Sequence, residues 1–290
     1  MPTLAAIRSI LLPTDFSDEA MVAFAHGLRL AIGLKAELEI LHVEPRNAQP
    51  DWRWGPHVRD TLVRWGFLPA SAGDDEVAAL GIRYRKVVAV GERADEAIVE
   101  EIVASHADLV VMAAHGRSGV RRWLEPSVTT PVALRGAVPV LVIPHSKRGF
   151  VNAETGEAAL TRILIPVAAK PHPAPAFDAT SILAKALPAE RTYFASLHVG
   201  PGAVETEWLE ENPAWSTLNW TADGGVVDAV EDTARTWSAD LIACVTEGRH
   251  GLLDALRGST VERLLDHTPT AFLVVPHEWG TDQIGTENRV

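Results

Sequence analysis

The chain has 290 residues, 47% of them hydrophobic and 22% charged, which is the balance of a soluble globular protein with room for about two domains. This composition excludes a disordered, collagen-like or disulfide-scaffold chain. The net charge of −12 is divided unevenly, because residues 1–150 carry 17 Lys and Arg against 18 Asp and Glu, whereas residues 151–290 carry 9 against 20. Neither half, at −1 and −11, has the basic surface that sequence-independent nucleic-acid binding needs.

Short apolar, β-branched runs alternate with amphipathic segments through the first half. The apolar runs predict strands near 7–12, 37–43, 83–89, 108–113 and 139–143. The amphipathic segments predict helices near 17–33, 55–66, 93–106 and 127–136. Ser17 is placed to cap the first of these helices and Gly33 to end it. Continuously apolar strands that alternate with helices indicate a parallel sheet buried on both faces.

The same pattern recurs in the second half. Ile-Leu-Leu-Pro at 10–13 returns as Ile-Leu-Ile-Pro at 163–166, and Leu-His-Val at 41–43 returns at 197–199. Asp-Leu-Val-Val at 108–111 returns as Asp-Leu-Ile-Ala at 240–243, so the offset falls from 156 to 132 between the second and third strands. We interpret the chain as a duplication whose second copy is about 24 residues shorter there. The expected domains are 1–147 and 158–279, each a Rossmann-like, five-stranded and mainly parallel sheet flanked by helices.

Parallel sheets of this kind bind ligands beyond the carboxyl ends of their strands, where the strand order reverses. The segments that matter most are therefore 14–15, 43–44 and 113–119. The chain has no Gly-Lys pair for a Walker A loop and no Gly-x-Gly-x-x-Gly. Gly-Arg-Ser-Gly at 116–119 lacks the spacing of a nucleophile elbow, so Ser118 is not an expected nucleophile. The 11 histidines lack the short paired spacing of a zinc site, and His42 and His198 end equivalent strands, which indicates a role in the fold. We expect neither catalytic residues nor a metal site.

Four motifs make the chain resemble a tandem universal stress protein, of the adenine-nucleotide α-hydrolase-like superfamily. They are Leu-Pro-Thr-Asp-Phe-Ser at 12–17, the His-Val that closes the second strand, His-Gly-Arg-Ser-Gly at 115–119, and Pro-Val-Leu-Val at 139–142. ATP-binding members of this family use Gly-x-x-Gly, nine residues and Gly-Ser/Thr, together with the first-strand aspartate. The resemblance implies an adenine-nucleotide site, for ATP with or without Mg, at Asp15, Val43, Ala113, Gly116, Arg117, Ser127 and Val128.

The first site departs from the family pattern at Ala113 and at Pro126. Proline supplies no N–H to a phosphate and its ring obstructs a close approach. The same residue also suits the first position of a helix, so Pro126 has a purely structural interpretation as well. The basic residues Arg117, Arg121 and Arg122 either meet phosphates or form a solvated face.

The second copy departs in a complementary way. It keeps the residues that match the end of the phosphate motif, which are Gly248, Gly258 and Ser259. It loses the first-strand aspartate to Ala168 and the first glycine to Val245, and Glu247 stands where the first copy has His115. A valine crowds a backbone that must approach a ligand, and a carboxylate repels phosphate. We therefore expect any polyphosphate to prefer the first half.

Three functions remain open from the sequence. The leading hypothesis is a non-catalytic stress-response protein that binds or senses an adenine nucleotide, mainly in the first domain. The second is a degenerate tandem scaffold that binds no nucleotide and acts through protein partners. The third is a slow ATP hydrolase. We expect the tryptophans between the second and third strands of each copy to pack on the sheet, with a partner surface as the alternative: Trp52, Trp54, Trp65, Trp208, Trp215 and Trp220.

The surroundings and partners of the chain are also predicted. The single cysteine, Cys244, forms no internal disulfide, and residues 1–13 do not have the pattern of a signal peptide. The longest apolar runs, 109–114 and 138–143, are far shorter than the roughly 18 residues of a membrane span. We therefore expect a cytoplasmic protein. In the family the last strands of two domains pair, which predicts contact between 138–143 and 270–275, and a homodimer remains open.

Overall fold

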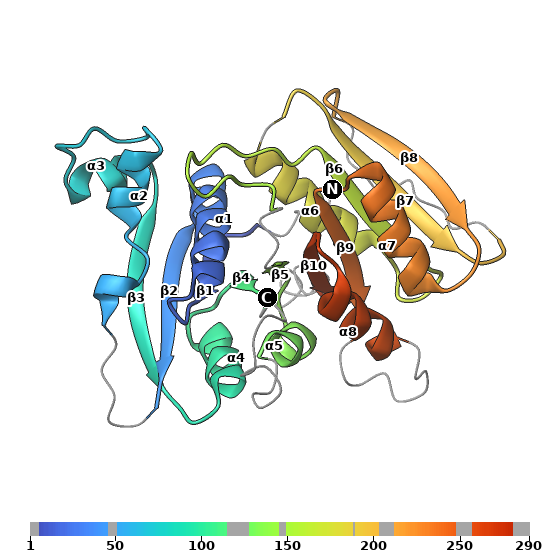
Figure 1. The fold of residues 1–290 in the computed structure, drawn as a ribbon, viewed down its shortest axis with the longest axis horizontal. Coiled ribbons are helices and arrows are strands. Elements are labelled where there is room, and N and C mark those ends of the chain that lie inside the picture. The colour runs from blue at the N-terminus through green and yellow to red at the C-terminus, as the bar shows by residue number, and fades with distance from the viewer. Residues whose placement is uncertain are drawn as a thin grey trace, which may run out of the picture.

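The computed structural model describes residues 6–45, 51–114, 128–144, 149–187, 189–202, 212–247 and 257–280. Within these residues ten strands form one sheet in the order β3-β2-β1-β4-β5-β10-β9-β6-β7-β8 (Figure 1). The strands are β1 (Ser9–Pro13), β2 (Glu37–Glu44), β3 (Arg83–Val90), β4 (Leu109–Ala113), β5 (Val140–Ile143), β6 (Arg162–Val167), β7 (Thr192–Val199), β8 (Trp215–Ala222), β9 (Leu241–Thr246) and β10 (Ala271–Pro276).

The two halves of this sheet have the same internal order. From each outer edge inward the sequence is third, second, first, fourth and fifth strand, and every pairing inside a half is parallel. The halves meet where β10 runs antiparallel to β5, with Leu273 opposite Leu141. The fold is therefore α/β with two repeated Rossmann-like units, as the alternation of apolar and amphipathic segments predicted.

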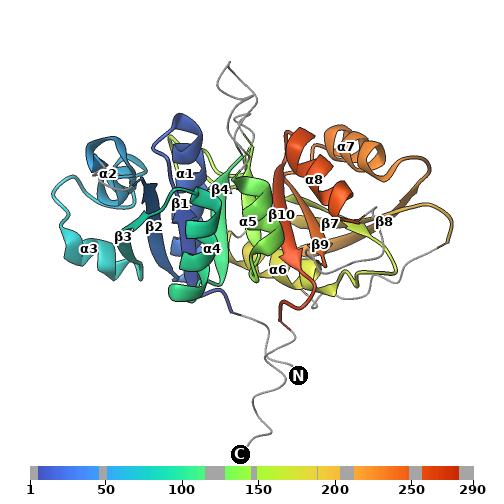
Figure 2. The ribbon, with the colours of Figure 1, turned by 90° about the horizontal axis from the view of Figure 1, so that it is seen from below.

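Helices cover both faces of the sheet. Figure 1 shows α1 and α6 on one face and α4, α5 and α8 on the other, and Figure 2 gives the same molecule from below. Apolar side chains that alternate along each strand join one of two buried clusters, as Leu12 faces α1 and Leu11 faces the opposite side. The helices are α1 (Asp18–Leu34), α2 (Val58–Arg64), α3 (Asp74–Ala79), α4 (Ala94–Ala104), α5 (Thr129–Arg135), α6 (Ala174–Ala186), α7 (Val226–Trp237) and α8 (Arg257–His267), with a 3₁₀ turn η1 (Trp52–Trp54).

The first helix confirms one predicted boundary and corrects the other. Ser17 is the N-cap of α1, and its hydroxyl accepts a hydrogen bond from the N–H of Ala20 at 3.2 Å. Gly33 does not end the helix, which was the expectation, because α1 continues to Leu34 and is capped by Lys35 at φ 54°. Gly33 lies where α1 crosses α6, and a Cβ there would be 2.0 Å from the carbonyl oxygen of Ala186. The glycine is therefore required by helix packing.

The segment that connects the two halves packs on the first one. A bridge between Val151 and Ala158 folds it back on itself. The N–H of Val151 donates to Nε2 of His26 in α1 at 3.1 Å, and Trp65 donates from Nε1 to the carbonyl of Ala153 at 3.0 Å. The guanidinium of Arg29 adds a hydrogen bond to the carbonyl of Gly156 at 2.9 Å. These contacts hold the connecting segment against α1 and α2.

The two halves differ between their second and third strands. In the first half η1, α2 and α3 lie between β2 and β3, and Val58, Leu62 and Val77 join the same cluster as Ile40 of β2. In the second half residues 200–214 join β7 to β8, and the described part of that segment contains no helix. Ser196 of β7 is the equivalent of Ile40 of β2, so the side chain at this position is polar in the second half.

Candidate functional site

Three predicted site residues lie at the carboxyl ends of adjacent strands. β1 lies between β2 and β4, and the order of the strands reverses at this point. Asp15 comes two residues after the end of β1, Val43 is the penultimate residue of β2, and Ala113 ends β4. The fold therefore brings the three together at the edge where open parallel sheets bind ligands.

Asp15 is exposed and fixed by the start of α1. Its Oδ1 accepts hydrogen bonds from the N–H of Ser17 at 3.0 Å and from the hydroxyl of Ser17 at 2.5 Å. Ser17 thus orients the carboxylate while it caps the helix. The positive end of the α1 dipole lies at the same place and favours a negative charge.

The backbone N–H and C=O groups of Val43 point past the end of β1. The carbonyl of Leu41 accepts from the N–H of Thr14 at 2.8 Å, whereas the carbonyl of Glu44 accepts from the N–H of Gly91 on the other side, at 3.0 Å. Backbone groups alternate in direction along a strand, so the N–H and C=O of Val43 point the same way as those of Leu41. Since β1 ends at Pro13, opposite Leu41, these groups face the space beyond that strand.

The predicted phosphate loop has its two ends anchored together. The chain leaves the sheet at Ala113 and returns at Val128, which is the N-cap of α5. The hydroxyl of Thr129, the first residue of α5, donates to the carbonyl of Ala113 at 3.2 Å. The loop itself lies outside the described residues, with His115, Gly116, Arg117, Ser118, Arg121, Arg122, Pro126 and Ser127.

The structure adds an aromatic cluster that the sequence did not reveal. The rings of Phe16 and His42 stack with centroids 4.1 Å apart and planes 11° from parallel, and Trp52 meets Phe16 edge-on at 5.2 Å. Phe16 has φ 64°, a conformation that is costly for a bulky residue and is retained only where its surroundings hold it. A Cβ on Gly55 would lie 2.8 Å from the Phe16 ring, so the chain after Trp52 closes tightly over it.

His42 connects this cluster to the backbone of the site. Its Nδ1 donates to the carbonyl of Thr14 at 2.7 Å, and its Nε2 lies 3.0 Å from Oε1 of Glu44. Both ring nitrogens of His42 therefore have a hydrogen-bond partner close by. In the second half Nδ1 of His198 lies 3.3 Å from the carbonyl of Val167, the equivalent of Thr14. This pair confirms that both histidines serve the fold, and His42 fixes the residue that precedes Asp15.

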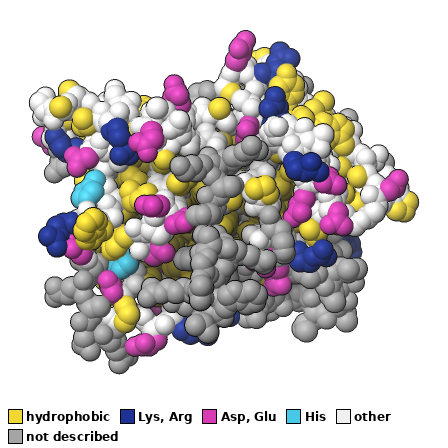
Figure 3. Space-filling view, in the orientation of Figure 1, with side chains coloured by type: hydrophobic (Ala, Val, Ile, Leu, Met, Phe, Trp, Pro, Cys, Tyr) yellow, Lys and Arg dark blue, Asp and Glu magenta, His cyan; other side chains and the backbone are white. Residues whose placement is uncertain are grey.

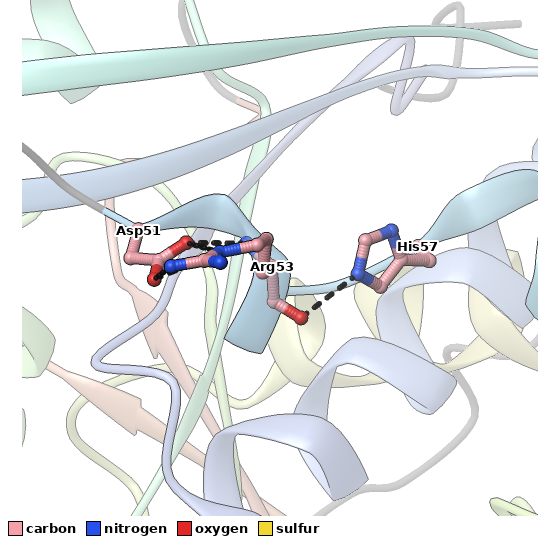
Figure 4. Close-up of polar contacts among 3 residues, drawn as sticks. All are labelled: Asp51, Arg53 and His57. Atoms are coloured by element: carbon pink, nitrogen blue, oxygen red, sulfur yellow. Dashed lines mark hydrogen bonds and ion pairs between the residues drawn. The ribbon is translucent and has the colours of Figure 1, made fainter.

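The 3₁₀ turn η1 contains Trp52 and is held by polar contacts among Asp51, Arg53 and His57, which Figure 4 shows. Asp51 receives two parallel hydrogen bonds from the guanidinium of Arg53, at 2.8 Å from Nε and 2.7 Å from Nη2, and His57 donates from Nε2 to the carbonyl of Arg53 at 3.2 Å. The hydrogen bonds from the Arg53 side chain hold the pKa of the Asp51 carboxyl below its ordinary value. Trp52 packs inward from this turn, and the ammonium of Lys86 lies 4.9 Å from its ring.

The tryptophans do not all follow the packing expectation. Trp65 is buried, and Trp52, Trp215 and Trp220 are half-buried against the two clusters. Trp54 contradicts the expectation, because 74% of its surface is exposed. Trp208 lies outside the described residues.

The equivalent edge of the second half lacks a carboxylate from the first strand. Ala168 follows β6 there and is exposed, and Val245 is half-buried in β9. Glu247 follows β9 directly. Gly258 and Ser259 lie in the first turn of α8, and Gly248 is outside the part of the chain that is described.

Two further searches covered the described residues. They contain no group of three or more His, Cys, Asp or Glu side chains that could hold a metal ion. No helix among them is long and apolar enough to cross a membrane.

Comparison with known proteins gives one consistent result. The profile of the Universal stress protein family matches residues 6–144 and 220–276. The universal stress protein MJ0531 of Methanocaldococcus jannaschii is 27% identical over 147 residues, which are 49% of this chain and 84% of that protein. A universal stress protein from Archaeoglobus fulgidus DSM 4304 has the same fold, with a TM-score of 0.61 and 19% identity over 92% of this chain and 96% of its own.

A second solved structure also matches along the whole chain. It is the functionally unknown protein PA1789 from Pseudomonas aeruginosa PAO1, with a TM-score of 0.63 and 17% identity over 96% of this chain and 98% of its own. At these identities the structural likenesses establish the fold alone, whereas the family profile covers more than half of the sequence. The chain belongs to the universal stress protein family.

Proposed function

We propose that this chain is a non-catalytic universal stress protein that binds an adenine nucleotide, ATP with or without Mg, mainly in its first half. One observation carries the proposal. Asp15 and the backbone of Val43 lie at the carboxyl ends of the paired strands β1 and β2, at the reversal of the strand order. In this proposal they hold the nucleoside, and Gly116, Arg117 and Ser127 hold the phosphates.

The surroundings of these two residues support a preformed site. Ser17 orients the Asp15 carboxylate, and His42 fixes the carbonyl of Thr14 just before it. The loop anchors Ala113 and Val128 lie together at the next strand, so a phosphate chain that begins near Asp15 has a short distance to cover. A site whose groups are held before binding loses less entropy when the ligand arrives.

The second half is proposed to bind polyphosphate weakly or not at all. Ala168 offers no side-chain acceptor to a ribose, and Glu247 adds a negative charge at the end of β9. We take 1–147 and 158–279 as the two domains, and the antiparallel pairing of β5 with β10 supports their association within one chain. One universal stress protein has been solved in complex with cAMP, but its likeness to this chain has a TM-score of only 0.35, so the assignment draws on the residues above.

Calorimetry on the full chain tests the proposal. We expect ATP–Mg to bind once per chain, with loss of at least about tenfold in affinity for Asp15→Asn, which equals about 1.4 kcal/mol. Asp18→Asn is the matched control, because Asp18 is an exposed carboxylate in the first turn of the same helix and is expected to change the affinity by less than twofold. Thermal melting of each variant shows whether it is folded.

Other outcomes separate the alternatives. If ATP, ADP and AMP give neither heat nor a thermal shift, and the denatured protein releases no nucleotide, the scaffold interpretation replaces this proposal. Mg-dependent phosphate release above background, abolished by Asp15→Asn, favours the hydrolase instead.

A further inference from the structure

Glu39 is a buried carboxyl in the middle of β2. The residue is 1% exposed, and the strand registers place it between Leu11 of β1 and Arg85 of β3. The acidic side chains visible in Figure 3 lie at the surface, where water solvates them. A carboxylate that is removed from water is costly unless both of its oxygens are paired. The partners of Glu39 therefore decide whether it is charged.

The side chain of Glu39 faces α4. Leu41, two residues further along β2, belongs to the same buried cluster as Ile98 and Ile102 of α4. Side chains two residues apart on a strand point to the same face of the sheet, so Glu39 lies on this side as well. Glu101 precedes Ile102 on the helix and is half-buried. Its carboxyl is close enough to that of Glu39 for a hydrogen bond.

The two carboxyl oxygens of Glu39 have different surroundings. Oε2 accepts a hydrogen bond from Nε of Arg85 at 2.6 Å and is paired with Nη2 of the same guanidinium. Oε1 is buried, and no N–H or O–H of the described residues donates to it. Ionised carboxylates only accept hydrogen bonds. A hydrogen bond between Glu39 and Glu101 therefore requires that one of the two carboxyls holds a proton.

Carboxyls predominate around Glu39. On β3, Arg85 lies 3.9 Å from the carboxylate of Glu37 as well, and Arg83, opposite Glu37 in the register, is exposed. Glu101 adds a third carboxyl from α4. The side chain of Arg85 is 52% exposed, so water screens its attraction for these groups. Burial raises the pKa of Glu39 from 4.5 to about 7, with the carboxyl of Glu101 adding to the effect and Arg85 opposing it.

We propose that Glu39 and Glu101 share one proton that holds α4 against β2, and that α4 opens more readily as the pH rises and this proton is lost to solvent. Its loss leaves two carboxylates facing each other, and like charges at such a contact repel. The change reaches a second helix, because Asp95 of α4 lies 3.4 Å from Arg135 of α5 in an ion pair. The inference is independent of nucleotide binding, since it uses none of the residues proposed to hold the ligand.

A pH titration of the full chain, with ¹³C-labelled glutamate carboxyls followed by NMR, tests whether the proton is shared. Glu39→Gln identifies the Glu39 signal, which we expect to titrate near pH 7 in the wild type. Glu101→Gln supplies an amide N–H to Oε1 of the ionised Glu39, so we expect the midpoint of Glu39 to fall by at least about one pH unit. Glu100→Gln is the matched control, because Glu100 is an exposed carboxylate on the same helix and its loss is expected to leave that midpoint unchanged.

Hydrogen exchange of the α4 amides tests whether the proton holds the helix. After correction for the intrinsic exchange rate, we expect the opening constant of α4 to rise at least about tenfold between pH 5 and pH 8 in the wild type, and less than about threefold in Glu101→Gln. Three results overturn the proposal. They are a Glu39 carboxyl that titrates below pH 6, a midpoint that Glu101→Gln leaves unchanged in a protein that melts like the wild type, and an equal pH dependence of α4 opening in both proteins.

Discussion

A Cβ atom placed on Gly33 of α1 would lie 2.0 Å from the carbonyl oxygen of Ala186 in α6. The two helices begin after equivalent strands, β1 and β6, so this contact joins the equivalent helices of the two halves. Only a residue without a side chain permits so close an approach of two backbones. Together with the pairing of β5 and β10, the crossing couples the two units of the sheet.

Gly33→Ala is therefore expected to destabilise the protein, although alanine favours a helix more than glycine does. The clash is with backbone, which cannot move without separating the helices, and overpacking of this kind costs about 1–3 kcal/mol. Urea unfolding of the full chain measures the loss. Gly27→Ala is the control in the same helix, because its nearest atom is the flexible end of the Leu12 side chain, at 2.6 Å. Equal losses for both variants would contradict the account.

His26 gives the connecting segment a dependence on pH. Burial lowers the pKa of its imidazole from 6.5 to about 4, so the folded ring is neutral and its Nε2 accepts the N–H of Val151. Between these values the unfolded chain binds the proton more tightly than the folded one, so stability falls as the pH falls from 6.5 toward 4. The full effect of such a shift is about 3 kcal/mol.

His26→Gln tests this dependence, because an amide oxygen can accept the Val151 hydrogen bond without taking up a proton. We expect the variant to be less stable than the wild type at neutral pH and to lose less stability on acidification. The measurement is urea unfolding at several values between pH 4 and pH 7. A variant whose stability falls with acid as steeply as that of the wild type would show that other groups cause the effect.

The strands and the principal helices could be predicted because their signals are local. Buried strands require continuous apolar runs, and the Ser17 cap requires only the residues that follow it. The role of Gly33 was missed because its cause is Ala186, far away in the sequence. The short helix α3 was missed for a related reason: it is six residues long, which leaves too few positions for a helical period.

The candidate site could also be predicted only in part from the sequence. The positions of Asp15 and Val43 could be predicted because they lie at the ends of strands, and the carboxyl ends of neighbouring parallel strands meet at one edge. The stack of Phe16 on His42 was not found, because it depends on a positive φ at Phe16 and on a turn that brings Trp52 back from beyond β2. The positive φ of Phe16 and the turn that returns Trp52 have no signal in the sequence pattern, although Phe16 follows β1 and Trp52 follows β2.

We predict that the carboxyl of Glu39 lowers the stability of the folded protein at high pH. Its side chain, 1% exposed on β2, lies beside Arg85 with Oε2 2.6 Å from Nε. Its Oε1 is buried and has no hydrogen-bond partner among the residues that the structure describes. Burial raises the pKa of this carboxyl from 4.5 to about 7, with the carboxyl of Glu101 adding to the effect and Arg85 opposing it. The folded state binds the proton more tightly, so stability is retained below pH 4.5 and falls as the pH rises through 7.

Glu39→Gln removes this titration. We expect the variant to gain about 1–2 kcal/mol on the wild type between pH 5 and pH 8. Glu37→Gln is the control, since the carboxylate of the half-buried Glu37 lies 3.9 Å from the same arginine. Parallel stability curves for wild type and Glu39→Gln would refute the prediction.

We expect Asp108 and Asp240 to hold equivalent strand starts in the two halves, with Asp240 contributing more to stability than Asp108. Oδ2 of Asp108 accepts the N–H groups of Arg8 and Ser9 at 2.8 and 3.0 Å, where β1 begins. Oδ2 of Asp240 accepts the equivalent N–H groups of Thr161 and Arg162 at 2.8 and 2.9 Å, and also the hydroxyl of Thr161 at 2.8 Å. Each aspartate therefore ties the start of the first strand of its half to the start of the fourth.

Alanine at either position leaves two backbone donors without this acceptor, which costs about 1–3 kcal/mol when they are shielded from water. Asp240→Ala also leaves the Thr161 hydroxyl without its acceptor, so we expect this variant to lose more stability than Asp108→Ala in urea unfolding. Thr161→Val in the Asp240→Ala background removes that hydroxyl. We expect it to bring the stability losses at the two aspartate positions closer together. If Asp108→Ala proves the more damaging variant, hydrogen bonding at the strand starts does not determine the difference between the halves.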